Sequence, residues 1–266
     1  MTTIDSAPLP ELASPQDSRP ATSTVIGVDI GGTGIKAAPV DRRLGSFSEG
    51  RVRIPTPQPA TPEAVATVVT ELAAGFGGDG PLGVALPAVI RSGIVETAAN
   101  IHTSWIGTDA VDLLQQATGR RVAVVNDADA AGMAEVRYGA GKDHHGLVLM
   151  VTLGTGIGTG LYIDGVLVPN TELGHLPLRG GGAERWAADS ARGRDDLSWK
   201  QWSKRLQRYF RLVEQLIWPD LIIVGGGVSK KSEKFLPLID LHTPIVPAQM
   251  HNDAGIVGAA LFAPAD

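Results

Sequence analysis

The sequence contains no cysteine. Disulfide bonds and cysteine-ligated zinc sites are therefore excluded. No apolar run approaches the ~20 residues that a membrane-spanning helix needs, and residues 1–23 lack the apolar centre of a secretion signal. An excess of positive charge is also absent. The formal net charge is −5, which argues against general nucleic-acid binding. We therefore expect a cytoplasmic protein with no membrane and no nucleic-acid partner.

What is present is typical of a globular protein. Of the 266 residues, 43% are hydrophobic and 19% are charged, so the chain can bury a sizeable core in one large domain or two smaller ones. Residues 1–23 differ from the rest, because they contain four prolines and show no apolar periodicity. We predict that they form a flexible arm.

The first ordered stretch predicts a strand, a tight turn and a second strand over residues 24–40. The turn contains Gly31, Gly32, Thr33 and Gly34, and glycine lets a backbone approach a ligand closely. Successive N–H groups in such a turn form a concave site for phosphate. Asp29, at the end of the first strand, could hold a cation that accompanies the phosphate. A plain hairpin with a glycine-rich turn explains these residues equally well.

The pattern of strand, glycine turn and strand recurs over residues 147–163, about half a chain later. Such a recurrence indicates a duplicated α/β unit. The glycines of the second turn do not predict a dinucleotide site, because a strand and not a helix follows them. Two hairpins of this kind could hold a phosphate chain from both sides.

Between and after the hairpins, apolar periodicity and capping residues predict alternating strands and helices. The strand over 122–125 delivers Asn126 and Asp127 to the start of a helix, which is where α/β sheets place ligands. The other expected elements are strands at 46–54, 82–87, 94–99 and 221–224, a helix at 61–74, a helix from a Thr108 cap to Thr118, helices at 128–137 and 198–218, a helix capped by Ser229, and a final helix at 253–262.

Several separate motifs occur in the order that is typical of one protein family. The chain resembles the ROK sugar kinases of the actin/hexokinase superfamily, and among them the actinobacterial polyphosphate/ATP glucokinases, which include glucomannokinases. The motifs are Asp29-Ile-Gly-Gly-Thr-Gly-Ile-Lys36, Leu86-Pro87 with Asn100, Asn126-Asp127-Ala128, Leu153-Gly-Thr-Gly-Ile-Gly158, Pro169-Asn-Thr-Glu-Leu-Gly-His-Leu176, Trp218 to Lys230, and Pro247-Ala-Gln249.

The resemblance implies phosphoryl transfer from polyphosphate or ATP to the 6-hydroxyl of glucose, with mannose as a further candidate acceptor. Asp127 would be the general base, although capping a helix is its alternative role. Carboxylate, amide and imidazole groups bind sugar hydroxyls. The sugar ligands implied in this way are Asn100, Asn126, Asp127, Glu172, His175 and Glu184.

On the donor side, the resemblance places Asp29 near Mg²⁺ and the transferring phosphoryl group. Lys36 could contact phosphate or be a solvated strand residue. The remaining phosphate or nucleotide ligands would be Gly31, Gly32, Thr33, Gly34, Thr155, Gly156, Gly225, Gly226 and Gly227. Many ROK kinases hold zinc through cysteines. Since this chain has none, we predict no zinc, which frees His175 for the sugar.

Polyphosphate is a polyanion and needs a basic surface. Two basic clusters could supply it, and the candidate contacts are Arg192, Arg194, Lys230 and Lys231. The alternative is that both clusters are solvated helix faces.

The fold class that we expect is α/β, with two ribonuclease-H-like domains of the actin/hexokinase type and a cleft between them. The small domain would span 24–125 and be completed by a helix within 250–266, and the large domain would span 126–249. The alternatives to a polyphosphate/ATP glucokinase are an ATP-only ROK sugar kinase, an exopolyphosphatase-type hydrolase and a sugar-binding regulator. A monomer and a homodimer are equally compatible with the sequence.

Overall fold

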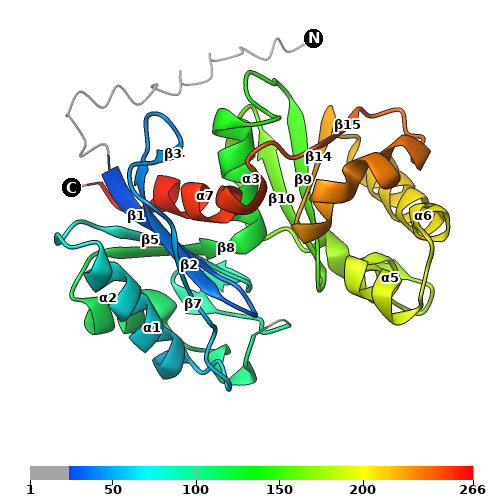
Figure 1. Cartoon of the computed structure of the whole chain (residues 1–266). Helices are drawn as coiled ribbons and strands as arrows, with labels where there is room; N and C mark the ends of the chain where they lie inside the picture. Colours follow the sequence, from blue (N-terminus) through cyan, green and yellow to red (C-terminus); the bar gives the residue numbers. More distant parts are fainter. Residues whose placement is uncertain (1–23, 100, 266) are drawn as a thin grey trace, which may run out of the picture.

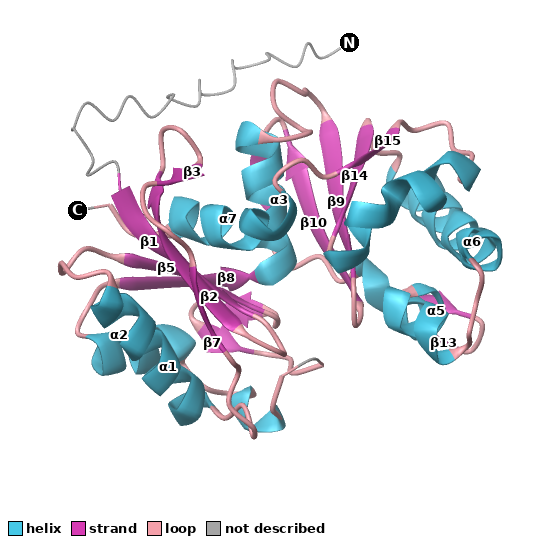
Figure 2. Ribbon diagram, viewed as in Figure 1, coloured by secondary structure: helices cyan, strands magenta, loops and turns pink. Residues whose placement is uncertain are grey.

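The structure, a computed structural model, describes residues 24–99 and 101–265. The predicted arm at 1–23 and the candidate sugar ligand Asn100 lie outside the described residues. Two β-sheets lie side by side, with two helices between them and the other helices on their outer faces (Figures 1 and 2). No helix in the described ranges is long and apolar enough to cross a bilayer.

The first sheet has the strand order β3-β2-β1-β5-β8, and β4 also pairs with β2. Strands β1, β5 and β8 are parallel, whereas β2 runs antiparallel to β1. Helices α1 (Pro62–Gly75) and α2 (Ala110–Thr118) cover its outer face (Figure 1). The strands are β1 (Thr24–Ile30), β2 (Ile35–Asp41), β3 (Ser46–Phe47), β4 (Val52–Ile54), β5 (Leu82–Leu86) and β8 (Val122–Asn126).

The second sheet has the order β11-β10-β9-β14-β15 and repeats the strand directions of the first. This repetition agrees with the duplicated unit that the two hairpins predict. Helix α6 (Trp199–Ile217) covers its outer face (Figure 1) and buries an apolar stripe that includes Trp202, Phe210 and Val213. The strands are β9 (Leu147–Leu153), β10 (Ile157–Ile163), β11 (Val166–Val168), β14 (Leu221–Gly225) and β15 (Ile245–Pro247).

Short elements join these layers. They are the β6–β7 hairpin (Ile90–Arg91 and Ile94–Val95), the β12–β13 hairpin (Pro177–Leu178 and Gly181–Gly182), α4 (Ala183–Ala187), α5 (Asp189–Arg194), and the 3₁₀ helices η1 (Thr103–Trp105), η2 (Leu173–His175), η3 (Gly227–Lys234), η4 (Leu236–Leu238) and η5 (His251–Asp253).

Helices α3 (Asp127–Tyr138) and α7 (Ala254–Phe262) lie between the two sheets (Figure 1) and pack on each other. Alanine and glycine make up five of the 12 residues of α3 and five of the nine residues of α7, which permits backbone contact. A Cβ on Gly258 would lie 1.7 Å from the carbonyl oxygen of Ala130, and one on Gly83 would lie 1.8 Å from that of Ala259. No side chain fits at these distances, so glycine is required at both positions.

The structure corrects the predicted strand at 46–54, which is interrupted between β3 and β4. Both short strands pair with β2, β4 opposite Ile35–Ala37 and β3 opposite Val40–Asp41. Pro39 lies between these two regions of β2 and has no N–H to donate, so the ladder breaks there. The strand predicted at 94–99 is also too long, because β7 ends at Val95, after pairing with β6 and forming a bridge from Ile94 to Asp109.

Three predicted helix ends are wrong as well. The cap of α2 is Asp109, which accepts the Asp112 N–H at 2.9 Å, because the Thr108 hydroxyl instead donates to Ser104. Ser229 lies inside η3 and donates to the Gly226 carbonyl, so it caps no helix. The last α-helix begins at Ala254, after the single turn of η5.

We propose a domain boundary between residues 125 and 126, with α7 assigned to the small domain because it packs on β1 and β5. The small domain is then 24–125 with α7, and the large domain is 126–249.

The α3–α7 contact leads to a stability prediction. Gly258→Ala should lower the free energy of unfolding by about 2–3 kcal/mol, because the added methyl group overpacks two backbones that cannot separate. The matched control is Gly193→Ala in α5, where a Cβ would meet nothing within 4 Å. This change should be neutral or slightly stabilising. Equilibrium denaturation of both variants tests the prediction, and equal stabilities would contradict it.

Candidate active site

The carboxyl ends of β1, β5 and β8 bring Asp29 and Asp127 to one edge of the first sheet. Asp29 is level with Ala85 of β5, and Ala85 is level with Val125 of β8, two residues before Asp127. Asn126 caps α3, because its Oδ1 accepts the N–H groups of Ala128 at 2.8 Å and Asp129 at 3.1 Å. A strand end and a helix start thus position the predicted base.

The Asp127 carboxyl has a raised pKa of about 6, against an ordinary value of 3.8. Burial is the largest cause, and the negative charge of Asp29 is the next. A hydrogen bond from the Ala128 N–H opposes the rise, and the charge of Glu172 adds to it. A carboxylate with a pKa near neutrality is a stronger proton acceptor than an ordinary aspartate. Asp127 therefore has the property that a general base needs.

Glu172, His175 and Glu184 form a second group, which comes from the large domain. His175 Nδ1 lies 3.4 Å from a Glu172 oxygen, and His175 Nε2 lies 3.4 Å from a Glu184 oxygen. The other Glu184 oxygen accepts the Ile157 N–H at 3.2 Å. Burial raises the pKa of Glu172, while His175 lowers it and Glu184 raises it. Since the charge of Glu172 also raises the pKa of Asp127, Glu172 lies near the predicted base.

The glycine turns have the form that the sequence predicts. In the first hairpin the Gly31 N–H bonds to the Gly34 carbonyl at 3.2 Å, and in the second the Gly154 N–H bonds to the Gly156 carbonyl at 3.1 Å. Gly32, Thr33 and Thr155 are exposed at the turns. The third glycine run, 225–227, packs against the end of β9, where Gly226 has a φ of +83° and a Cβ would lie 2.3 Å from the Leu153 carbonyl oxygen. These turns offer exposed backbone to a ligand.

Lys36 lies opposite Asp29 across the first hairpin, and its Nζ is 2.8 Å from an Asp29 oxygen. Both side chains are partly buried. The Asp29 carboxylate also packs against Gly255 in the first turn of α7, where a Cβ would lie 3.0 Å from Asp29 Cγ. Asp29 is therefore held between a cation and the positive end of a helix dipole.

Two cavities adjoin these turns. One of about 310 Å³ is lined by Gly31, Gly32, Thr56, Pro87 and His102. Another of about 580 Å³ follows the third glycine run and is lined by Ser229, Lys230, Gln249 and His251, among others.

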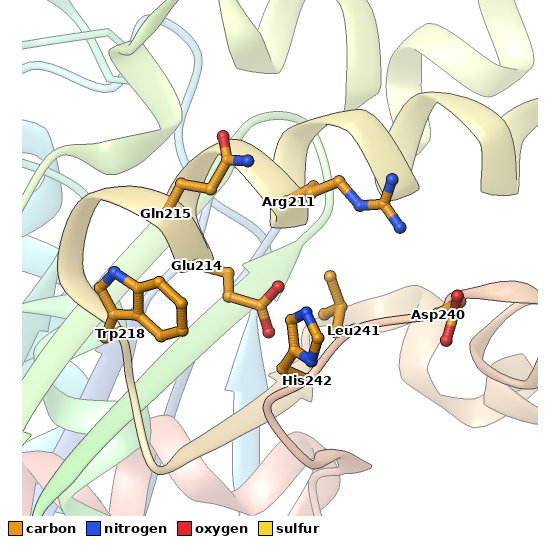
Figure 3. Close-up of a pocket in the computed structure, with 7 residues that line it drawn as sticks. All are labelled: Arg211, Glu214, Gln215, Trp218, Asp240, Leu241 and His242. Carbon is orange, nitrogen blue, oxygen red and sulfur yellow. The ribbon is translucent and has the colours of Figure 1, made fainter.

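A further cavity, of about 420 Å³, lies at the carboxyl end of α6 and is lined by none of the predicted site residues (Figure 3). In Figure 3 the Glu214 side chain lies between the rings of Trp218 and His242. Glu214 accepts the Thr243 N–H at 2.6 Å, and so it fastens the loop before β15 to the helix.

The candidate basic residues differ in whether they form ion pairs with acidic side chains of the protein. Arg192 pairs with Asp189 at 2.8 Å and lies over the Trp199 ring at 4.4 Å. Arg194 pairs with Asp195, which also binds Arg205. Lys230 and Lys231 are exposed and form no ion pair within the described ranges.

Two site residues escaped the sequence analysis, Asp129 and Asn170. Asp129 is buried, and its Oδ2 accepts the Asn170 N–H at 2.9 Å. Burial raises the pKa of Asp129 to about 7. The signal for Asp129 was its place two residues after Asp127 in the same helical turn, and Asn170 lies within the motif that contains Glu172. Neither position reveals its partner without the fold.

No cluster of three or more histidine, aspartate or glutamate side chains with metal-binding geometry occurs in the part of the chain that the structure describes. The prediction that the protein lacks zinc stays a prediction. A hard cation such as Mg²⁺ needs no such cluster. Asp29 and Asp127 place carboxylate oxygens at the edge of the sheet where phosphate is expected. Oxygen ligands of this kind suit Mg²⁺ with several retained waters.

Known proteins resemble this chain in sequence and in architecture. The ROK family profile matches residues 25–194. The chain belongs to the ROK family. It is 50% identical over 241 residues to a polyphosphate glucokinase of Mycobacterium tuberculosis, an alignment that covers 90% of this chain and 91% of the relative.

Solved structures agree with this assignment. The inorganic polyphosphate/ATP-glucomannokinase of Arthrobacter sp. strain KM is 52% identical with a TM-score of 0.88, over 90% of this chain and 98% of that one. A ROK-family glucokinase from Streptomyces griseus, solved with glucose and AMPPNP, is 27% identical with a TM-score of 0.79, over 90% and 99% of the two chains. The predicted fold class, two α/β domains of the actin/hexokinase type, is confirmed.

The electrostatics of this ROK-family site predict a measurable shift. Asp29→Asn should lower the pKa of the Asp127 carboxyl from about 6, because it removes the negative charge that contributes most to raising this pKa. Carboxyl ¹³C NMR titration of the labelled protein measures this pKa, with Asp127→Asn identifying the resonance. The control is Asp164→Asn at the exposed β10–β11 turn, which should leave the value unchanged. An unaltered Asp127 titration in Asp29→Asn would contradict the prediction.

Proposed function

We propose that this protein is a hexose phosphotransferase that makes glucose 6-phosphate, with inorganic polyphosphate or ATP as the phosphoryl donor. The observation that carries the proposal is the raised pKa of Asp127 at a strand end between a glycine turn and the Glu172–His175–Glu184 group. The similarity to a polyphosphate glucokinase and to a polyphosphate/ATP-glucomannokinase supports both the reaction and the donors.

The acceptor binds between Asp127, at the start of α3, and the Glu172–His175–Glu184 group. Glu172, His175 and Glu184 present carboxylate oxygens and an imidazole, which hydrogen-bond to sugar hydroxyls. We retain Asn126 and Asn100 as further sugar ligands. In the structure, however, the Asn126 side chain is already used, since its Oδ1 caps α3 and its amide donates to Ala88. Its role is therefore mainly to hold Asp127 in place.

The reaction is an in-line displacement at phosphorus. The sugar 6-hydroxyl oxygen forms a bond to the terminal phosphorus atom of the donor as Asp127 accepts the hydroxyl proton. The bond between that phosphorus and the bridging oxygen breaks, and the shortened polyphosphate or ADP leaves with the electron pair. With a pKa of about 6, Asp127 is largely deprotonated at pH 7 and ready to accept this proton.

The donor binds along the glycine turns. The backbone of 32–34 and of 155–156 offers N–H groups to phosphate oxygens, and Thr33 and Thr155 add hydroxyls. A nucleotide would pack against Gly225, Gly226 and Gly227 and extend into the 580 Å³ cavity beside Lys230 and His251. We propose that Asp29 holds Mg²⁺, directly or through water. When bound, Mg²⁺ neutralises charge on the phosphates, and the Lys36 ammonium is close enough to Asp29 to act on the same phosphates.

A polyphosphate chain needs cations that are free to bind it. Lys230 and Lys231 meet this condition better than Arg192 and Arg194, whose guanidinium groups already have carboxylate partners. We therefore place the outer part of the polyphosphate track at Lys230 and Lys231. Use of mannose, a monomeric or homodimeric state and a cytoplasmic location stay predictions. Among the alternatives, a hydrolase of polyphosphate would have no use for the hydroxyl-binding group near Asp127.

The role of Asp127 gives a prediction on activity. Asp127→Asn should lower kcat by a factor of about 10²–10⁴ in a coupled assay for glucose 6-phosphate, because the general base is lost. In the unaltered enzyme, kcat/KM for glucose should fall as the pH drops below about 6, since Asp127 must be deprotonated to act. Asp164→Asn serves as the control. Retained turnover in Asp127→Asn would refute its role as base.

The basic track gives a second prediction. Lys230→Ala should raise KM for polyphosphate roughly fivefold, because a free cation is removed from the path of a polyanion. The matched control is Lys200→Ala, at an exposed position of α6. Steady-state kinetics with long-chain polyphosphate at low salt measure the effect. Equal KM values for both variants would remove Lys230 from the track.

A further inference from the structure

Asn170 connects the two domains through its side chain. Its Oδ1 accepts the Ile90 N–H at 3.0 Å, and its Nδ2 donates to the Ile90 carbonyl at 2.9 Å. Ile90 belongs to the β6–β7 hairpin of the small domain, whereas Asn170 follows β11 of the large domain. An amide that pairs with both backbone groups of one residue imitates the pairing between two strands. The contact is therefore specific in position and orientation.

Asp129 holds Asn170 in the conformation that this contact requires. Asn170 has a φ of +60°, in the left-handed region that asparagine tolerates better than most residues. Its backbone N–H donates to Asp129 Oδ2 at 2.9 Å. Asp129 is 1% exposed, and its Oδ1 has no hydrogen-bond partner within the described ranges. Burying a carboxyl group that accepts only one hydrogen bond costs free energy. This cost indicates that Asp129 has a specific structural role.

The contacts close a ring around the predicted base. Asn126 Nδ2 donates to the Ala88 carbonyl at 3.1 Å, and Asn126 Oδ1 accepts the Asp129 N–H. Asp129 binds Asn170, Asn170 binds Ile90, and Ile90 lies two residues after Ala88 in the chain. Asp127 is the neighbour of Asn126 inside this ring, and Glu172 is two residues beyond Asn170. A shift of Asn170 would therefore move Glu172 relative to Asp127.

We propose that Asn170 is a positioning residue for the acceptor sugar, because it ties the segment that carries Glu172 and His175 to the β6–β7 hairpin of the opposite domain. Asp129 keeps the Asn170 backbone in place through its hydrogen bond to the Asn170 N–H. This inference rests on the proposed function, since the sugar is the ligand that Glu172 and His175 bind. It adds a specific contact between the domains on the acceptor side.

The test uses Asn170→Gly, which keeps the left-handed backbone without strain and removes only the side chain. KM for glucose should rise about tenfold through the loss of two hydrogen bonds, while kcat and KM for ATP stay within about twofold. The second variant is Asn170→Asp, which retains the size of the side chain but cannot donate to the Ile90 carbonyl, and it should raise KM for glucose in the same way. The matched control is Asp143→Gly, an exposed position with a φ of +62°.

Hydrogen exchange gives a readout that does not depend on activity. The Ile90 amide should exchange faster in Asn170→Gly than in the unaltered protein, and glucose should slow the exchange of residues 88–97 only where Asn170 is intact. Unchanged KM for glucose in both Asn170 variants would overturn the proposal, even if exchange at Ile90 rises. Equal increases in KM for glucose and for ATP would overturn it too, since they indicate a general loss of structure. If the unaltered protein does not phosphorylate glucose, the proposed function itself fails, and exchange at Ile90 still tests the contact.

Discussion

Backbone contact between α3 and α7 is the constraint on which the rest of the structure depends. Gly258 lets α7 touch α3 at Ala130, and Gly83 lets β5 touch α7 at Ala259. Helix α3 also packs on β9 and β10 of the second sheet. The two sheets thus share one pair of helices made of small residues. Asp127 begins one of these helices and Asp29 lies against the start of the other, so the same packing sets the distance between the two carboxylates.

Negative charge is concentrated where the chemistry is expected. Burial and neighbouring carboxylates raise the pKa values of Asp127 and Asp129 to about 6 and about 7. Groups of this kind bind more protons in the folded than in the unfolded protein. Their contribution to stability is therefore present at low pH and is lost as the pH rises from about 4 to about 7. The burial that carries this cost at neutral pH also makes Asp127 a better base, while Asp29 is paired with Lys36.

Under the proposed function, the two substrates would be recognised by different kinds of groups. Phosphate would meet backbone N–H groups at glycine turns, which are the same for a nucleotide and for polyphosphate. The sugar would meet side chains, whose geometry depends on both domains. Asn126 and Asn170 each fasten the β6–β7 region, at Ala88 and at Ile90. The same glycine turns could thus bind either donor, while the side chains of the acceptor site select a particular sugar.

The local sequence was sufficient to predict those structural features that a single continuous segment forms. The two hairpins, the Asn126-Asp127 strand end and the apolar stripe of α6 follow from residues that are neighbours in the chain. The break between β3 and β4 also had a local cause, Pro39, but its effect appears only once β2 pairs with both strands. The start of α2 depends on which side chain accepts the free N–H groups of its first turn, and this is Asp109 and not Thr108.

Contacts between distant segments needed the tertiary structure. The pairing of Lys36 with Asp29 requires the hairpin register, and that of Asn170 with Ile90 spans 80 residues. The partners of Arg192 and Arg194 decide which cations are free, and charge along a sequence cannot show this. The sequence by itself determined the types of site and their order along the chain. Only the fold decided which groups meet, because hydrogen bonds and charge interactions act over a few ångströms in space, whatever the separation along the chain.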